Sequence, residues 1–310
     1  MRHPHLLTPS LVAIAHGSRD PRAGATIAGL LAVARDRATA HGLAGLEVRG
    51  AFLGHAPPAP LQVLTALAGQ DDGQDGGQGT GQRDVVVLPL LLTAAYHSGT
   101  DIPGLLAGAT ASLPGLRIRY GEPLGPHPAL VRALERRLAE AGQDPADHPA
   151  RTAVVLASAG SSHPAANAAI ARMGSAWQAA RGWRAVLPAY ASVASPTPGQ
   201  AVAALLRDGA QRVVVASYLL APGLFADRIR DASLAAGATA VSGPLGAAPE
   251  VADVLLQRYT EACTTEACAT GACTAPVVQN GILVQNGTGA QPSGSPGLVL
   301  ATRASARPAS

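Results

Sequence analysis

The 310-residue chain contains no lysine, three cysteines and few aromatic residues. All 23 basic residues are therefore arginine, and the formal net charge is only +3. Because no basic run accompanies this small charge, the composition argues against nucleic acid as a partner. Aromatic residues make up 3% of a chain that is 47% hydrophobic, so alanine, valine and leucine must fill its cores.

The cysteines and the apolar runs also exclude several classes of protein. Cys263, Cys268 and Cys273 all lie near the carboxyl terminus, so the globular part needs no disulfide. Their spacing is not that of a CxxC zinc or ferredoxin site, and it leaves open an expendable tail or a thiol cluster. No apolar run reaches the roughly 18 residues of a membrane span, and the first ten residues lack the apolar region of a signal peptide. We therefore expect a cytoplasmic protein without a membrane partner.

A short apolar run, Leu11 to Ala15, ends abruptly in His-Gly-Ser-Arg-Asp-Pro. A run of this length fits a strand that is buried on both faces. Asp20 can cap a following helix, and Pro21 suits the first helical turn. We therefore expect His16 at the carboxyl edge of a parallel sheet, where open α/β folds bind their ligands.

A second stretch has the same form. The apolar run Val85 to Leu92 leads into a loop that carries His97, and Pro103 follows where a helix can begin. If both strands belong to one parallel sheet, His16 and His97 emerge from the same edge. Two imidazoles across a cleft can hold one divalent metal ion and leave coordination positions open.

The plan then repeats. Four blocks of the first half recur in the same order in the second half, beginning with the strand Ala153 to Ala157 and its glycine turn. Parallel strands need crossover helices, so we expect an α/β fold of two tandem halves, each a four-stranded parallel sheet with helices on both faces. We place these halves at residues 1–145 and 151–262, and a disordered, low-complexity tail at residues 263–310.

The second copy lacks the histidines. His16 aligns with Ala159, and His55, which follows the second strand, aligns with Val193. His97 aligns with Phe225 when the strands are kept in register. The sequence therefore predicts one active site, built on the first half. The second half is expected to stabilise the fold and to form one side of the cleft between the halves.

Residues 15–21 and 88–103 together resemble the sirohydrochlorin chelatases, the small class II tetrapyrrole chelatases. The resemblance covers roughly residues 10 to 262. It implies a lyase that inserts Fe²⁺ or Co²⁺ into sirohydrochlorin during siroheme or cobalamin biosynthesis. It also implies that the metal is a substrate, that no organic cofactor is used, and that a monomer holds two pseudo-twofold halves. His16 and His97 stand at the family's metal-binding and catalytic positions.

The substrate carries eight carboxylates, so Arg19 and Arg22, close to His16, are candidate clamps for it. One position departs from the family pattern, which usually has a glutamate after a Phe-Leu pair. Here Gly54 and His55 follow that pair. His55 can act as the base or as a third metal ligand, or the role can be vacant, so the identity of the proton acceptor stays open.

Three other functions remain in view. The nearest is a chelatase for nickel or for another tetrapyrrole. The second is a non-catalytic protein that holds a metal or a tetrapyrrole in a bilobed cleft. The third, a nucleotide-binding α/β domain, is disfavoured because neither a Walker loop nor a GxGxxG motif follows the first strand.

Overall fold

The computed structural model describes residues 8–69, 82–93, 102–143, 147–269, 277–279 and 282–284, with side chains up to residue 264. The stretch from Gln70 to Arg83 is rich in glycine, glutamine and aspartate, a composition that indicates a surface insertion. It lies mostly outside the described residues, and so does His97. Contacts divide the chain into two compact units, Met1–Glu266 and Ala267–Ser310. Both predicted halves belong to the first unit.

Strands and helices alternate along the first half. In chain order they are β1 (Ser10–Ala15), α1 (Pro21–Ala38), the short helix η1 (Thr39–His41), β2 (Val48–Phe52), α2 (Pro60–Ala68), β3 (Arg83–Pro89), α3 (Ile102–Ser112), β4 (Leu116–Tyr120) and α4 (Pro128–Glu140). Every residue of β1 is buried, as its apolar run predicts. The carboxylate of Asp20 caps α1 by accepting a hydrogen bond of 2.9 Å from the Arg22 amide, which confirms the predicted start of this helix.

The second half follows the same order. It contains the short helix η3 (Pro149–Arg151), β5 (Thr152–Ser158), α5 (Pro164–Arg181), β6 (Ala185–Tyr190), α6 (Pro198–Arg207), β7 (Arg212–Tyr218), α7 (Leu224–Ala235), β8 (Ala240–Val241) and α8 (Pro249–Ala269). All paired strands of the two large sheets are parallel, in the orders β2-β1-β3-β4 and β6-β5-β7-β8. The predicted pair of four-stranded sheets is thus confirmed.

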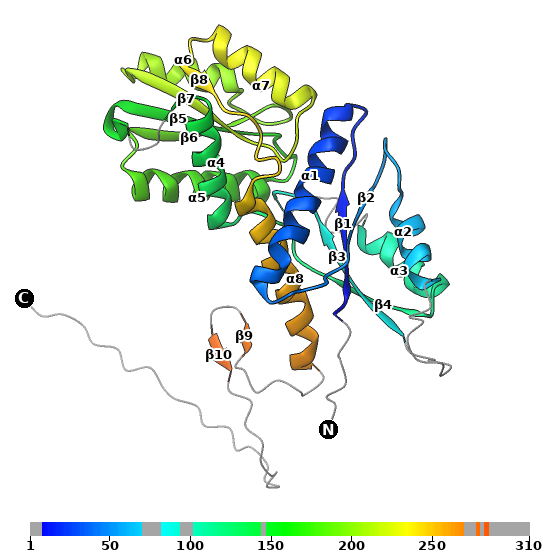
Figure 1. Ribbon diagram of the computed structural model, residues 1–310. Helices are drawn as coiled ribbons and strands as arrows, with labels where there is room; N and C mark the ends of the chain where they lie inside the picture. The colour runs from blue at the N-terminus through cyan, green and yellow to red at the C-terminus, as the bar shows by residue number, and fades with distance from the viewer. Residues whose placement is uncertain are drawn as a thin grey trace, which may run out of the picture. The chain divides into compact units, whose positions relative to one another are not determined.

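Helices cover both faces of each sheet (Figure 1). In the first sheet, α2 and α3 pack on the face that carries Val12 and Ile14. In the second sheet, α6 and α7 pack on the face that carries Val155. The alternation of buried residues between the two faces follows from the two-residue period of a strand.

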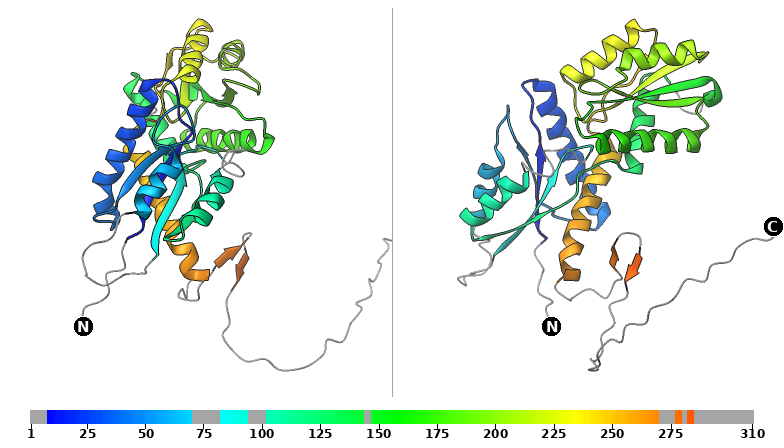
Figure 2. Two further views of the ribbon diagram at one scale, coloured as in Figure 1. Left: turned by 90° about the vertical axis from the view of Figure 1, so that its right-hand side faces the viewer. Right: turned by 180° about the vertical axis from the view of Figure 1, so that it is seen from behind.

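The last helix of each half packs on the sheet of the other half. Helix α8 joins the core of β1 and α1, and the Tyr259 hydroxyl donates a hydrogen bond of 2.7 Å to the carbonyl of Pro9. Asp253 of α8 accepts a hydrogen bond of 2.6 Å from Arg37 of α1, so the two helices lie side by side in both views of Figure 2. Helix α4 in turn contacts β7. The packing therefore crosses the sequence boundary between the two repeats.

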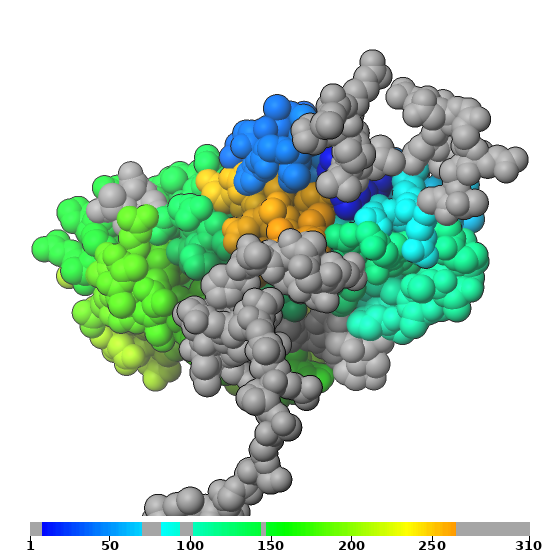
Figure 3. Space-filling model, turned by 90° about the horizontal axis from the view of Figure 1, so that it is seen from below, coloured from blue at the N-terminus to red at the C-terminus, as the bar shows by residue number. Residues whose placement is uncertain are grey.

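The segment assigned to the tail begins as a helix. Helix α8 continues through Cys263 to Ala269, and a strand pair follows, β9 (Val277–Gln279) with β10 (Ile282–Val284). In Figure 3 the orange surface of α8 adjoins a blue surface from the first part of the chain. His41 of η1 lies 2.9 Å from Asp253 of α8. Among the described helices, none has both the length and the hydropathy that a membrane crossing requires.

Candidate functional site

His16 follows the last residue of β1 and is exposed. The loop that carries it lies directly against the loop after β2. The Gly54 amide donates a hydrogen bond of 3.1 Å to the His16 carbonyl, and an added Cβ on Gly17 would come within 1.8 Å of the Gly54 carbonyl oxygen. Only glycine fits there, at φ +89°, so the close approach of the two loops depends on this residue.

His55 occupies the tip of the second loop. Its φ is +63°, and the Ala56 amide donates a hydrogen bond of 2.8 Å to the Gly54 carbonyl, which closes a tight three-residue turn around His55. The side chain is exposed. The turn therefore presents His55 to solvent at the same sheet edge as His16.

The second half has the same pair of loops, with Ala159 and Val193 at the positions of His16 and His55. Gly160 has φ +85°, and its added Cβ would meet the Ser192 carbonyl oxygen at 2.2 Å. Val193 has φ +49° at the centre of a turn closed by the Ala194 amide and the Ser192 carbonyl, 2.6 Å apart. The predicted equivalence of His55 with Val193 is thus visible in the backbone. The strained turn belongs to the scaffold, and the histidine is specific to the first half.

The strand that leads to His97 is described only up to Thr93. The Leu90 amide donates a hydrogen bond of 2.7 Å to the Ile14 carbonyl, so β3 leaves the sheet beside β1. The Tyr218 hydroxyl donates a hydrogen bond of 3.0 Å to the Leu92 carbonyl from the end of β7. His97 itself lies outside the described residues, and its distance from His16 stays a prediction.

The two arginines differ. Arg19 is exposed and makes no hydrogen bond or ion pair within the described part of the chain. Arg22 lies 2.6 Å from Asp20 and 2.7 Å from Asp227, which belongs to α7 of the second half. Hydrogen bonding to Arg22 lowers the pKa of both carboxyl groups. The sequence gives no sign of the role of Asp227, because acidic residues are common in the first turn of a helix, where they interact favourably with the helix dipole.

The described residues hold no group of three or more histidine, cysteine, aspartate or glutamate side chains that could bind a metal ion. The arrangement at the edge of the first sheet is therefore two exposed imidazoles, His16 and His55, on touching loops. A site of this kind can offer nitrogen ligands to a divalent metal, but the described residues alone do not enclose it.

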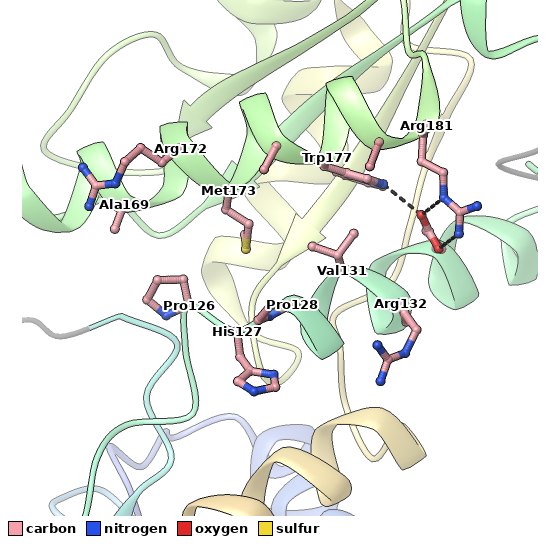
Figure 4. Close-up of a pocket in the computed structure, with 13 residues that line it drawn as sticks. Pro126, His127, Pro128, Val131, Arg132, Ala169, Arg172, Met173, Trp177 and Arg181 are labelled. Carbon is pink, nitrogen blue, oxygen red and sulfur yellow. Dashed lines mark hydrogen bonds and ion pairs between the residues drawn. The ribbon is translucent and has the colours of Figure 1, made fainter. Parts of the chain in front are cut away.

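Two cavities among the described residues lie elsewhere. One, of about 660 Å³, separates α4 from α5 (Figure 4). Val131 and Met173 line it, and at one end Glu135 accepts hydrogen bonds from Trp177, at 2.9 Å, and from Arg181, at 2.6 Å. The other cavity, of about 420 Å³, lies between α1 and the segment before α8. None of the predicted site residues that the structure describes lines either cavity.

Comparison with known proteins gives a consistent result. The chain matches the family model CbiX over residues 10–141 and 153–262. It is 30% identical over 151 residues to the sirohydrochlorin cobaltochelatase of Priestia megaterium. The matched segment makes up 49% of this chain and 49% of that protein. It is 28% identical over 150 residues to the sirohydrochlorin ferrochelatase of Bacillus subtilis. Here the matched segment makes up 48% of this chain and 56% of that protein. The chain spans about half the length of the curated relatives it matches.

Solved structures show the same fold. SirB from Bacillus subtilis with Fe³⁺ superposes with a TM-score of 0.69 at 24% identity, over 84% of this chain and 98% of that chain. CbiX, described as the terminal enzyme for biosynthesis of siroheme in denitrifying bacteria, superposes with a TM-score of 0.56 at 23% identity, over 82% and 99% of the two chains. These similarities confirm the predicted architecture of two tandem chelatase-like halves.

Proposed function

The chain belongs to the CbiX family, and from this we propose that it is a sirohydrochlorin chelatase, a lyase that inserts Fe²⁺ or Co²⁺ into sirohydrochlorin. Relatives matching half its length carry the names sirohydrochlorin cobaltochelatase and sirohydrochlorin ferrochelatase. The product then serves siroheme or cobalamin biosynthesis. The metal is a substrate in this reaction, and we propose no organic cofactor.

One observation carries the proposal. The two halves share the same pair of touching loops, down to the positive φ angles of Gly17 and Gly160 and of His55 and Val193. Only the first half has imidazoles at the positions of His16 and His55, where the second half has Ala159 and Val193. A scaffold that needs these turns for folding alone has no use for histidine at their tips, because Val193 adopts the same backbone conformation. We infer that His16 and His55 are present for their chemistry.

Metal insertion needs a partly dehydrated metal ion, and it needs acceptors for the pyrrole protons that the macrocycle loses. We propose that His16 and His97 bind the ion, because neutral imidazole suits Fe²⁺ and Co²⁺ and two ligands leave several positions open. His55, on the touching loop, is then within reach to accept a proton or to serve as a third ligand. Arg19, which is exposed and unpaired within the described residues, is available to a peripheral carboxylate of the substrate.

Arg22 takes a different part in this proposal. Asp20 and Asp227 already hold its guanidinium, so a substrate carboxylate has to compete with two protein carboxylates for it. We propose that Arg22 chiefly joins the start of α1 to α7 and so sets how close the two halves come beside His16. Its role as a direct substrate clamp is secondary.

A turnover assay tests the function. Anaerobic mixtures of sirohydrochlorin with Fe²⁺ or Co²⁺ should change their absorption spectrum over many equivalents per protein molecule. His16→Ala and His97→Ala should each reduce turnover at least about a hundredfold while the circular dichroism spectrum stays unchanged. His148→Asn serves as the matched control: it removes an exposed histidine that precedes β5, at the other end of the second sheet, and asparagine tolerates the positive φ of that position. A spectral change limited to one equivalent would show a binding protein, and near-normal rates in His16→Ala would refute the assigned site.

A further inference from the structure

Exposed apolar side chains gather at the carboxyl edge of the second sheet. Val193, at the tip of the loop after β6, is 75% exposed. Leu224 and Phe225, at the start of α7, are 63% and 38% exposed. We call these three residues the apolar lip. Val193 has the place of His55 in the repeat, and Phe225 aligns with His97 in the sequence when the strands are kept in register, so the second half has apolar residues at the positions aligned with these two histidines.

The strand order sets the width of the apolar lip. Strands β6 and β7 lie on either side of β5, so their loops flank the β5 loop at two strand spacings, about 10 Å. The flanked loop has small residues from Ala159 to Ser162 and ends in the exposed His163. An apolar surface of this width suits a flat, multi-ring molecule better than a single side chain.

A contact between the halves shows which way the lip faces. Asp227 lies three residues after Leu224, so both side chains point from neighbouring positions of one helix face. Asp227 is bonded to Arg22, at 2.7 Å, in the first turn of the helix that follows His16. The start of α7, with Leu224, therefore lies on the side of the second half that faces the His16 loop.

One cation accompanies the apolar groups. Arg228 lies one turn after Leu224, is exposed, and makes no hydrogen bond or ion pair among the described residues. Exposed apolar area is unfavourable in water, and an arginine without a partner can pair with an added carboxylate. A ligand with a flat apolar body and carboxylates at its edge satisfies both.

We propose that the apolar lip is the surface on which the ring face of the tetrapyrrole stacks, with Arg228 pairing to a peripheral carboxylate, opposite the histidines that deliver the metal. The inference rests on the proposed function, because it concerns the same substrate. It explains why the two copies of one scaffold diverged: one edge binds the metal and the other binds the macrocycle. The lip then sets the affinity for the tetrapyrrole and leaves the affinity for the metal unchanged.

The test compares Val193→Ser, Leu224→Ser and their double variant with Leu234→Ser in the full chain. Leu234 is the matched control, because it lies in the last turns of the same helix and is 48% exposed. The double variant should raise the KM for sirohydrochlorin about tenfold while kcat and Co²⁺ binding without the tetrapyrrole stay unchanged. Arg228→Ala should raise the KM about threefold and make it less sensitive to salt. Leu234→Ser should behave as the unmodified protein.

Two results overturn the proposal. One is an unchanged KM in the double lip variant. The other is a parallel loss of kcat and Co²⁺ binding, which would place the lip in the metal site. Direct binding of metal-free sirohydrochlorin, followed by its fluorescence, separates this proposal from the proposed function. If the unmodified protein binds the ring but does not turn over, the function fails while the lip variants still test the stacking surface.

Discussion

The hydroxyl of Tyr218 donates a hydrogen bond of 3.0 Å to the carbonyl oxygen of Leu92. Tyr218 is 1% exposed and ends β7 of the second half, whereas Leu92 lies just beyond β3, five residues before His97. Burial raises the pKa of the Tyr218 hydroxyl, so it stays a protonated donor. The second half of the chain thus fixes the backbone at Leu92, which leads to His97, the second predicted metal ligand.

Tyr218→Phe should therefore reduce both stability and Co²⁺ affinity. The Leu92 carbonyl loses its partner, which costs about 1–3 kcal/mol of unfolding free energy. Tyr259→Phe is the matched control: the Tyr259 hydroxyl bonds to the Pro9 carbonyl at the opposite end of the sheet. Urea unfolding should show similar losses for both variants. Isothermal titration should show weaker Co²⁺ binding only for Tyr218→Phe, and equal binding would contradict the link to His97.

Gly17→Ala should be much more harmful than Gly42→Ala. Both glycines have positive φ, +89° and +74°. An added Cβ at Gly42 meets nothing within 4 Å, so its cost is the backbone strain alone, about 1–2 kcal/mol. At Gly17 the Gly54 carbonyl must also move, and we expect a total loss of about 3 kcal/mol or more. Thermal unfolding measures both, and equal melting temperatures would show that the two loops separate easily.

Ala59→Thr should stabilise the protein. In the second half, Thr197 caps α6 and its amide bonds to the Gln200 side chain, while the Gln200 amide bonds to the Thr197 hydroxyl, at 3.4 Å. In the first half the Gln62 side chain accepts from the Ala59 amide, at 2.9 Å, but alanine has no oxygen to complete the box. The added hydroxyl should contribute about 0.5–1 kcal/mol in urea unfolding, and Thr197→Ala should lose a similar amount.

Asp84 should make stability depend on pH in the acid range. Hydrogen bonding from Arg117, with Arg119 nearby, lowers the pKa of its carboxyl group below the ordinary value of 3.8. The folded state therefore favours the ionised form, so the stabilisation is complete above that value and is lost as the pH falls through the lowered pKa. Asp84→Asn should lose about 1 kcal/mol at pH 7, and the difference should shrink below about pH 4. Asp231→Asn, at an exposed ion pair, should change little.

Removing the chain after Glu266 should leave turnover and stability intact, because the first compact unit ends there. Removing it after Ala262 should destabilise the protein. The Arg119 guanidinium, whose side chain is 13% exposed, donates a hydrogen bond of 3.1 Å to the Cys263 carbonyl and would lose that acceptor. The melting temperatures of the two truncated chains test this difference: only the chain that ends at Ala262 should melt below the full chain.

Much of the fold could be predicted from local signals. The apolar pattern of the sequence indicates a helix over Ile102 to Ser112, a strand over Leu116 to Tyr120 and a helix that begins at Pro128, and these agree with α3, β4 and α4. Helix α4 starts at a proline, α3 has a proline at its second position, and β4 directly follows Gly115. The duplication could also be predicted from the sequence, because both copies keep similar turn residues in the same order.

The candidate site could be predicted from the sequence only in part. The position of His16 at a sheet edge follows from an apolar run that stops at a polar turn. The partner of Arg22 did not follow, because Asp227 is 205 residues away and no local pattern relates the two. The distance between His16 and His97 stays a prediction.

Local chemistry alone specifies the strands, the helix starts, the duplication and the placement of His16 and His55 in the first copy, because periodicity, caps and turns act over a few residues. The pairing of α8 with the first sheet and of α4 with the second was decided by the tertiary structure. An amphipathic helix shows that it must cover an apolar face, but it does not show which of two similar sheets supplies that face. The meeting of Arg22 with Asp227 and of Tyr218 with Leu92 depends on that choice in the same way.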